Sequence, residues 1–489
     1  MLGVSGLRGI VGASLTPTVA ARFAGAFGSW LRARSDEPPR VVIGADGRAG
    51  YEPIHRAAVN ALAAAGCRVH DLGVAMTPTV AVVADRLAAD GGMVVTASHN
   101  PQDWNGLKCL VRSGVPANTP DACAPPAPDA GSIVTAFRDA PDPAPLPDAP
   151  AARDPDGART HARLAAGCLA AHDAHAVRAA RPRVLLDSVN ASGRDGGRIL
   201  LAELLGCELV HHGSEPTGVF PHPPEPTKDN LASLCAGVRR FNAAVGFAQD
   251  PDGDRLAIVD ETGRYVGEEY TLALAAESLL SAASPPGGPS GARPAPASPP
   301  ILVANLSTSR MIDDIAARHG ARVLRTPVGE ANVVEAMKRE RAAGRDVILG
   351  GEGNGGVIWP DVTYVRDSLS AMALVLALMA RTGKSVSRLV AEIPSYAIRK
   401  DKLDLARKED AAPACEALFA AYARRASDAP GERIRIDRQD GVRVDFGATR
   451  AWLHVRASNT EPIMRLIAEA PDDALAGRVL AEARALMRA

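Results

Sequence analysis

The chain has 489 residues, of which 46% are hydrophobic, and its formal net charge is −1. This length predicts three or four folded domains, and the near-neutral charge without a sustained basic stripe argues against a nucleic-acid partner. The seven cysteines include no C-x-x-C pair, which indicates reduced thiols and argues against a zinc site. No basic segment precedes the opening apolar stretch, and no apolar run approaches the roughly 20 residues that a membrane span needs. We therefore expect a cytoplasmic protein without a membrane partner.

Three apolar runs, each ending in a small polar turn and followed by helical periodicity, lie at residues 41–46, 184–188 and 301–305. This order is typical of a strand and crossover helix on a covered sheet. Towards the C-terminus, alternating polar and apolar residues predict antiparallel strands at 441–446, 451–456 and 463–467. The predicted fold class is therefore α/β: three similar α/β domains with mixed sheets and a smaller C-terminal α+β domain.

Two segments, 115–157 and 283–300, are rich in Pro, Ala, Gly and Asp. Such a composition buries too little apolar surface to offset the entropy of ordering, so we expect flexible or loosely packed loops. The first begins soon after Lys108, where it could gate a site, but a tolerated surface insertion is the simpler explanation. We divide the chain into domains at residues 1–157, 158–263, 264–388 and 389–489.

The first candidate for chemistry is Ser98, in the turn T-A-S-H-N-P that follows the apolar run 92–95. The turn places a hydroxyl nucleophile beside His99, and a serine in this position can carry a phosphoryl group. Serines in loops more often hydrogen-bond their own turn. Ser98 alone is therefore weak support for catalysis.

The second candidate is the run D-P-D-G-D-R at residues 250–255, with three carboxylates at alternate positions. Oxygen ligands of this charge suit a hard cation such as Mg²⁺. A solvated turn is the ordinary alternative. A calcium loop of the EF-hand kind is excluded because Arg255 stands where the loop needs glycine and short apolar strands flank the run. We expect a metal on a strand–loop–strand hairpin, with Arg255 available to a phosphate.

Four motifs in this order resemble those of the α-D-phosphohexomutase family. The chain has the phosphoserine loop T-A-S-H-N-P at 96–101, the metal loop at 250–255, a sugar-specificity loop G-E-G-N-G-G at 351–356 and a phosphate loop R-A-S-N-T-E-P at 456–462. Lesser marks agree, among them S-G-L-R-G at 5–9 and T-P-V-G at 326–329. The resemblance covers nearly the whole chain.

The resemblance implies that Ser98 is phosphorylated in the resting enzyme and gives its phosphoryl group to a hexose or hexosamine phosphate. A 1,6-bisphosphate would be both the intermediate, which turns over in the site, and the activator. Mg²⁺ is the implied cofactor, and its implied ligands are the phosphoserine at Ser98 with Asp250, Asp252 and Asp254. The other implied catalytic residues are Arg8, Lys108 and His99. Lys108 is the candidate for proton transfer or charge stabilisation, since a lysine desolvated among cations can have a lowered pKa, whereas His99 could equally shape the turn.

Binding residues follow from the same resemblance. The implied substrate contacts are Arg255, Gly329, Glu352 and Asn354. The implied anchor of the non-reacting phosphate is formed by Arg456, Ser458, Asn459 and Thr460. From the residues alone, the two loops could instead be a glycine-rich turn and a polar strand end. Arg48, in the run D-G-R, is the weakest of the basic candidates, since an Asp-x-Arg pair can simply lock its own loop.

The specificity loop departs from the family pattern G-E-x-S-G-H. Asn354 replaces the serine, and Gly356 stands where the histidine would be. The proton-transfer role of that histidine cannot be carried over, so Lys108 or a histidine from elsewhere would have to serve. The oligomeric state is not legible from the sequence.

Three functions remain open. The loop and the opening segment look most like those of proteins classed as phosphoglucosamine mutases, which interconvert glucosamine 6-phosphate and glucosamine 1-phosphate. The alternative within the family is a phosphoglucomutase/phosphomannomutase. A phosphosugar-binding protein that lost turnover is the alternative of another class. It would predict damage to Ser98 or to the aspartates, yet all four are present.

Overall fold

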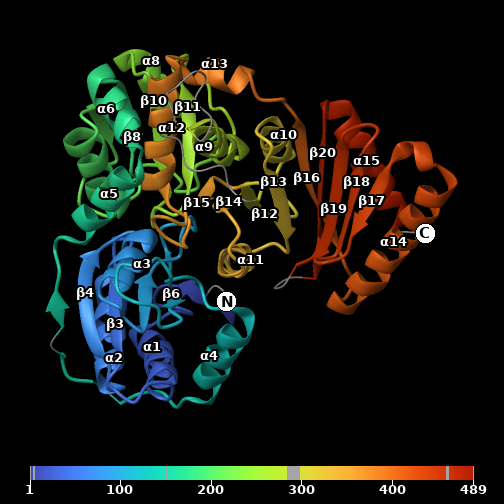
Figure 1. Cartoon of the computed structure of the whole chain (residues 1–489). Helices are drawn as coiled ribbons and strands as arrows, with labels where there is room; N and C mark the ends of the chain where they lie inside the picture. Colours follow the sequence, from blue (N-terminus) through green and yellow to red (C-terminus); the bar gives the residue numbers. More distant parts are fainter. Residues whose placement is uncertain are drawn as a thin grey trace.

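The computed structural model describes residues 2–3, 6–144, 146–149, 151–282, 298–458 and 462–487. Its strands form one seven-stranded, two four-stranded and one five-stranded sheet. Figure 1 shows the first unit (blue) below the second (green) and third (yellow), with the fourth (red) beside the third. The prediction of three α/β units with mixed sheets and a C-terminal α+β unit is confirmed. The residues at which one domain ends and the next begins stay a prediction.

The first sheet has the order β1-β2-β6-β5-β3-β4-β7. Its strands are β1 (Leu2–Gly3), β2 (Gly6–Ile10), β3 (Arg40–Ala45), β4 (Arg68–Val74), β5 (Gly91–Val95), β6 (Trp104–Val111) and β7 (Ala152–Arg153). Its helices are α1 (Pro17–Arg32), α2 (Glu52–Ala64), α3 (Thr77–Arg86) and α4 (Ala127–Asp139). Strand β3 is buried on both faces, which explains why its sequence is a continuous apolar run.

The second and third sheets have the orders β11-β10-β8-β9 and β13-β12-β14-β15. The second unit contains β8 (Arg183–Asp187), β9 (Glu208–His212), β10 (Val245–Gln249), β11 (Leu256–Asp260), α5 (Gly157–Cys168), α6 (Ala171–Ala180), α7 (Gly193–Arg198), the π-helical η1 (Ile199–Leu204) and α8 (Ala232–Phe241). The third contains β12 (Ile301–Asn305), β13 (Arg322–Thr326), β14 (Val347–Glu352), β15 (Gly356–Ile358), α9 (Glu269–Ala282), α10 (Met311–Arg318), α11 (Glu330–Ala342), α12 (Ser368–Thr382) and α13 (Val386–Ala391). The three predicted strands at 41–46, 184–188 and 301–305 are therefore confirmed as β3, β8 and β12.

One four-strand pattern recurs in all three α/β units. A central strand has parallel neighbours on both sides, and one of these neighbours returns as an antiparallel hairpin. These hairpins are β5–β6, β10–β11 and β14–β15. Their connecting loops, residues 96–103, 250–255 and 353–355, carry the phosphoserine, metal and specificity motifs. The topology thus puts each motif at the same place in its own unit.

The fourth sheet is antiparallel throughout, in the order β16-β20-β19-β18-β17. Its elements are β16 (Ala397–Asp404), β17 (Ile434–Asp437), β18 (Val442–Phe446), β19 (Ala451–Ala457), β20 (Ile463–Ala470), α14 (Ala411–Asp428), α15 (Asp473–Leu486) and the short 3₁₀ turns η2 (Lys408–Asp410) and η3 (Pro430–Glu432). The three predicted antiparallel strands are confirmed as β18, β19 and β20. Among the described residues, no helix combines the length and the apolarity that a membrane crossing requires.

The expectation of a loosely packed loop at 115–157 is wrong. Helix α4 lies within it and buries Ala130, Ile133 and Phe137, which share one helical face. The Phe137 ring meets that of Phe23 edge to face, at 5.5 Å between centroids. The high Pro and Ala content hid this short apolar stripe. In the other segment, 283–300, residues 283–297 lie outside the described part of the chain.

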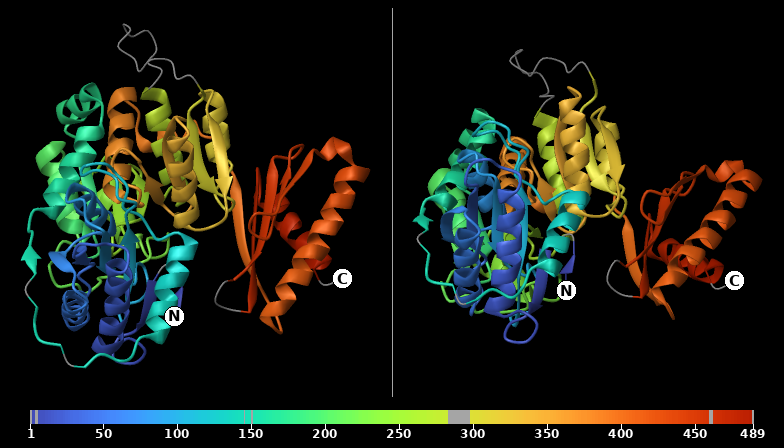
Figure 2. Two further views of the ribbon diagram at one scale, coloured as in Figure 1. Left: turned by 60° about the horizontal axis from the view of Figure 1, so that its bottom comes forward. Right: turned by 90° about the horizontal axis from the view of Figure 1, so that it is seen from below.

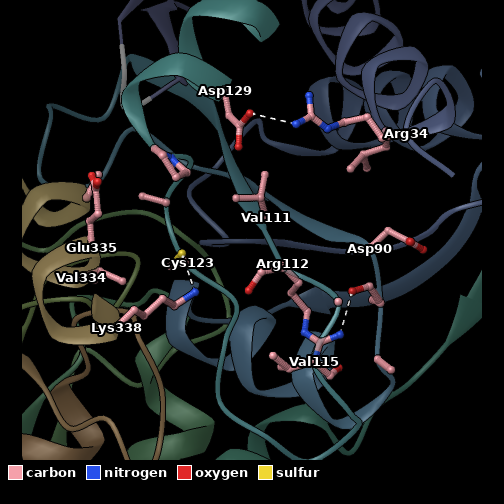
Figure 3. Close-up of a pocket in the computed structure, with 18 of the residues that line it drawn as sticks. Arg34, Asp90, Val111, Arg112, Val115, Cys123, Asp129, Val334, Glu335 and Lys338 are labelled. Carbon is pink, nitrogen blue, oxygen red and sulfur yellow. Dashed lines mark hydrogen bonds and ion pairs between the residues drawn. The ribbon is translucent and has the colours of Figure 1, made fainter. Parts of the chain in front are cut away.

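The first and third units interlock through apolar side chains. Val365, from the connection before α12, belongs to the same buried cluster as Val42 and Val80 of the first unit. In return, Cys123 of the first unit packs with Ile301 and Val333 of the third. Figure 3 shows this seam, where Lys338 of α11 lies 3.3 Å from the Cys123 sulfur beside a cavity of about 840 Å³. Because each unit places a side chain in the apolar cluster of the other, the first and third units are fixed against each other.

The contact between the third and fourth units is largely polar, and Figure 2 shows the fourth unit standing apart from the first. His454 of β19 lies 2.9 Å from the Ser307 hydroxyl, measured from its Nδ1. The backbone N–H of Arg310 donates to a carboxylate oxygen of Glu469 at 2.8 Å. Polar contacts of this kind cost less to expose to water than the apolar side chains that join the first and third units.

A buried carboxyl lies on the third-unit side of this junction. Glu269 begins α9, and one of its oxygens accepts from the Ser309 N–H at 2.9 Å. Burial, with a smaller contribution from the charge of Glu469, raises the pKa of Glu269 to about 8. The folded protein therefore holds a proton there that an unfolded glutamate releases near its ordinary pKa of 4.5.

This proton links stability to pH. The contribution of protonated Glu269 to the free energy of unfolding is complete below about pH 4.5. It is lost as the pH rises towards 8, because in that range the unfolded chain releases the proton and the folded chain keeps it. The side chain of Glu269→Gln stays neutral at every pH. The free energy of unfolding of this variant should therefore fall less over this range than that of the wild type, and the difference should be on the order of 3 kcal/mol. Urea unfolding at pH 5 to 8.5 measures the difference. The exposed Glu335→Gln on α11 is the control, and equal pH slopes in the Glu269 variant and the wild type would contradict the prediction.

Candidate active site

Ser98 lies in the loop between β5 and β6 and is buried, with 1% of its surface exposed. Its φ angle of 51° is in the left-handed region, which is strained for a residue other than glycine. Its N–H donates to the Thr96 hydroxyl at 2.8 Å. Its own hydroxyl donates to Asp250 at 2.8 Å and lies 3.3 Å from Nδ1 of His99. The loop therefore turns the Ser98 hydroxyl toward the acidic loop of the second unit.

The fully buried Arg48 stabilises this loop through hydrogen bonds to backbone carbonyls. Its Nε donates to Asp46 at 2.9 Å, and its two terminal nitrogens donate to the carbonyls of Ser98 at 2.5 Å and Trp104 at 2.6 Å. The Thr96 hydroxyl donates to the same Asp46 carboxylate at 2.6 Å. Arg48 thus locks the Ser98 loop and not only its own, a role that its sequence neighbours alone do not reveal.

The three aspartates of the second unit form one buried cluster. Asp250, Asp252 and Asp254 are each 0% exposed, and each offers an oxygen within 4.8 Å of the others. One oxygen of Asp252 and one of Asp254 are buried without a hydrogen-bond partner. Carboxylate oxygens left unpaired in such a place suit a hard divalent cation. The residues therefore fit the predicted Mg²⁺, and the metal loop lies on a hairpin as expected.

Cations from other units face this cluster. Lys108 of β6 contacts Asp252 at 2.5 Å and Asp254 at 3.0 Å. Burial alone would lower the pKa of Lys108, but the two carboxylates outweigh it, and the pKa is raised. Of the two roles considered for Lys108, the raised pKa favours charge stabilisation over proton transfer by a lysine of lowered pKa. Arg8 of β2 also faces the cluster and donates to the Asn100 side chain at 3.1 Å.

The carboxyls of the cluster differ in proton affinity. Burial and the neighbouring charges of Asp254 and Asp252 raise the pKa of Asp250. Burial opposes ionisation of Asp254 too, but Arg366 and Lys108 hold its pKa below the ordinary value. Burial, Arg255 and Arg8 lower the pKa of His99 to about 3, so its imidazole is neutral near pH 7.

Arg255 stands at the edge of the cluster. Its guanidinium lies 3.9 Å from Asp254 and 3.8 Å from Glu225, and His99 lies 3.8 Å from the same glutamate. At these distances Arg255 is not hydrogen-bonded to either carboxylate, and its buried Nε has no hydrogen-bond partner, so this donor remains available to another anion. Arg255 therefore lies near the Ser98 loop, as the sequence analysis expected.

The specificity loop of the third unit lies beside the same cluster. Glu352, at the end of β14, is 5% exposed and accepts from the Asn305 amide at 2.8 Å. Asn354 uses its side-chain oxygen to accept from the Gly356 N–H at 3.3 Å. Gly329 precedes α11 with a φ of 126°, a conformation that L side chains rarely adopt. Its neighbour Glu330 faces Arg366.

Arg366 is the residue of this site that the sequence analysis missed. Its guanidinium donates to Asp254 at 2.7 Å and to Glu352 at 2.9 Å, and so joins the metal loop to the specificity loop. The only signal in the sequence is an Arg-Asp pair directly before the apolar helix α12. Such a pair also occurs as an ordinary helix cap, and Asp367 does cap α12.

The phosphate loop is described in part. Arg456 is the penultimate residue of β19, and the Ser458 N–H donates to the Ile463 carbonyl at 2.9 Å. Asn459 and Thr460 lie outside the described residues. Burial lowers the pKa of Arg456, while the charges of Asp440 and Glu352 oppose that change. Glu352 of the specificity loop is thus among the charges that act on Arg456.

Comparison with known proteins gives the same assignment over the whole length. Four domains described as phosphoglucomutase/phosphomannomutase domains I, II, III and the C-terminal domain match residues 1–123, 165–263, 268–396 and 402–486. A phosphoglucomutase/phosphomannomutase of Thermococcus kodakarensis is 33% identical, over 97% of this chain and 95% of its own. A relative in Methanopyrus kandleri, described as a "probable phosphoglucosamine mutase", is 30% identical over 96% of this chain and 94% of its own.

Among solved structures, a phosphoglucomutase/phosphomannomutase family protein of Burkholderia thailandensis superposes with a TM-score of 0.77. It is 26% identical, and the match covers 100% of this chain and 98% of that one. The four matched domains follow the order of the four sheets. This chain therefore belongs to the α-D-phosphohexomutase family of isomerases.

Proposed function

We propose that the protein interconverts the 6- and 1-phosphates of a hexosamine or hexose by passing a phosphoryl group through Ser98. The observation that carries this proposal is the 2.8 Å contact between the Ser98 hydroxyl and Asp250, inside a buried cluster of carboxylates faced by cations. Phosphoryl transfer depends mainly on positioning and on neutralising the charge of the transferred group. A buried serine in such a surrounding meets both needs.

In the proposed reaction, phosphorylated Ser98 gives its phosphoryl group to the free hydroxyl of a sugar monophosphate. The P–O bond to Ser98 breaks, a P–O bond to the sugar oxygen forms, and the proton of the sugar hydroxyl ends on the Ser98 oxygen that the phosphoryl group leaves. The resulting 1,6-bisphosphate turns over in the site. Its other phosphoryl group then returns to Ser98, which restores the phosphoenzyme and releases the isomeric monophosphate.

Asp250, Asp252 and Asp254 are the residues that would hold Mg²⁺, as the unpaired buried oxygens of two of them support. The cation would supply a positive charge next to the phosphoryl oxygens. Lys108, Arg8 and Arg255 add fixed positive charge around the same place. In this proposal Lys108 stabilises charge, since its two carboxylate partners keep it protonated.

The sugar is proposed to lie between the third and fourth units. Glu352 and Asn354 would bind ring hydroxyls, with Gly329 at the margin of the site. The non-reacting phosphate would be bound by Arg456, Ser458, Asn459 and Thr460. A guanidinium with hydroxyl and amide donors suits a phosphate dianion.

For the substrate we propose glucosamine phosphate first, supported by the G-E-G-N-G-G loop and by the Methanopyrus relative. Glucose or mannose phosphate is the second candidate, which the Thermococcus relative at 33% identity favours.

The phosphoserine step is tested with Ser98→Ala. Because the variant has no oxygen to carry the phosphoryl group, kcat should fall at least 1,000-fold, about 4 kcal/mol in the barrier. Sugar phosphate binding, measured by calorimetry, should persist. Intact mass measurement should show a phosphorylated fraction in the wild type only. The exposed Ser132→Ala on α4 is the control. Full activity of Ser98→Ala would sink the mechanism.

The metal proposal is tested with Asp252→Asn. Asp252 accepts from Lys108 and from the Thr77 hydroxyl through one oxygen, and its other oxygen has no partner. Removing the negative charge should weaken Mg²⁺ binding at least tenfold, measured by calorimetry without substrate. Asp229→Asn, an exposed position in the same unit, should leave it unchanged. Equal affinity in Asp252→Asn and the wild type would exclude this cluster as the metal site.

The substrate is tested by measuring kcat/KM for glucosamine, glucose and mannose phosphates in one coupled assay with Mg²⁺ and a 1,6-bisphosphate activator. Glucosamine phosphate should be preferred at least tenfold, about 1.4 kcal/mol of discrimination. A preference for glucose or mannose phosphate would replace the first candidate by the second. No turnover of any of the three, with the sugar phosphates still bound, would favour a phosphosugar-binding protein.

A further inference from the structure

Gly356 and Arg366 compete for one space in the site. A Cβ atom on Gly356 would lie 2.2 Å from Cδ of Arg366 and 3.0 Å from its Cγ. Atoms this close cannot coexist, and Cδ is the middle of a side chain whose far end is held. A glycine at position 356 is therefore the condition for the observed path of Arg366. At position 356, where the family pattern has a histidine, this chain has a glycine, and the side chain of Arg366 passes beside it.

The guanidinium of Arg366 is held by three carboxylates. Two of its nitrogens donate to Asp254 at 2.7 Å and Glu352 at 2.9 Å, and Nε lies 3.3 Å from Glu330. Arg366 is 8% exposed. A planar guanidinium can bond two carboxylates at fixed angles, which an ammonium cannot do. The three acidic side chains belong to the metal loop, the specificity loop and the start of α11.

The backbone of Arg366 is fixed on both sides. Val365 is packed in the apolar cluster of the first unit. Asp367 caps α12 by accepting from the N–H groups of Leu369 and Ser370, and it lies 3.1 Å from His161. The Arg366 side chain therefore starts from a rigid point between the units, as a group that orients others must.

We propose that Arg366 is a positioning residue that holds the sugar-facing Glu352 and the metal-cluster Asp254 in a fixed relation, and that Gly356 is its obligatory partner. Without Arg366, three buried carboxylates would face one another with less compensating charge and would move apart. Substrate specificity and metal affinity would then depend on one guanidinium. The sugar part of this inference rests on the proposed function, whereas the metal part does not.

The test compares Arg366→Ala and Arg366→Lys with the wild type. Arg366→Ala should weaken calorimetric binding of glucosamine 6-phosphate, or of the sugar phosphate preferred in the assay above, at least tenfold without metal. It should also lower Mg²⁺ affinity at least threefold without substrate, because Asp254 is no longer held in place. Arg366→Lys keeps the positive charge but loses the planar guanidinium that bonds two carboxylates. Compared with Arg366→Ala, it should restore Mg²⁺ affinity more than sugar phosphate affinity. Arg381→Ala is the matched control, because Arg381 lies in α12 and pairs with Asp173 at 2.5 Å.

Gly356→Ala gives an independent arm that keeps Arg366. The added methyl should displace the arginine and lower sugar phosphate affinity at least fivefold, with no further loss when it is combined with Arg366→Ala. Gly431→Ala, with no atom within 4 Å of the new methyl, is the control.

Binding of both ligands within twofold of the wild type in Arg366→Ala, with only a lower Tm, would overturn the positioning role. A harmless Gly356→Ala would overturn the pairing. Failure of the wild type to turn over any sugar phosphate would instead refute the proposed function, and the Mg²⁺ measurement would still decide the role of Arg366.

Discussion

The site depends on the neutralisation of three carboxylates that are buried together. Isolated charges in a protein interior cost several kcal/mol each, so the acidic loop of the second unit is stable only where cations meet it. Those cations come from the other α/β units: Lys108 from the first and Arg366 from the third, both in contact with Asp254. Charge compensation therefore holds the three hairpin loops together. The buried cluster is as much a structural constraint as a chemical one.

The repeated hairpin explains how three distant parts of the sequence reach one place. Each α/β unit has a central strand, parallel neighbours and an antiparallel return, and each return begins with a motif loop. The first and third units are interlocked by Val365 and Cys123. The fourth unit is attached by polar contacts such as that between Ser307 and His454. A polar junction between the third and fourth units suits a site whose proposed intermediate must turn over between two binding modes.

The sequence predicted well what depends on local pattern. The strands at β3, β8 and β12, the antiparallel C-terminal strands and the hairpin with the aspartates all follow from short runs of residue types. It predicted poorly what depends on tertiary partners. Helix α4 was hidden because only three apolar residues in a Pro- and Ala-rich segment reach the core. Proton transfer by a Lys108 of lowered pKa was left open beside charge stabilisation, because its carboxylate partners lie more than a hundred residues away. Arg366 was missed because its three partners come from separate elements, between 14 and 112 residues away, and no local pattern joins them.

The Gly356 departure changes how proton transfer can be understood at this site. A histidine there would be a group that exchanges protons near pH 7, whereas Arg366 is a permanent cation. The remaining histidine beside Ser98 is His99, and its pKa of about 3 makes it a weak base. Lys108 is held protonated by Asp252 and Asp254. The groups around Ser98 are therefore better suited to fixed charge than to proton exchange. In a loose transition state the sugar hydroxyl keeps its proton until late, so a site built this way can act through electrostatic stabilisation with little help from a strong base.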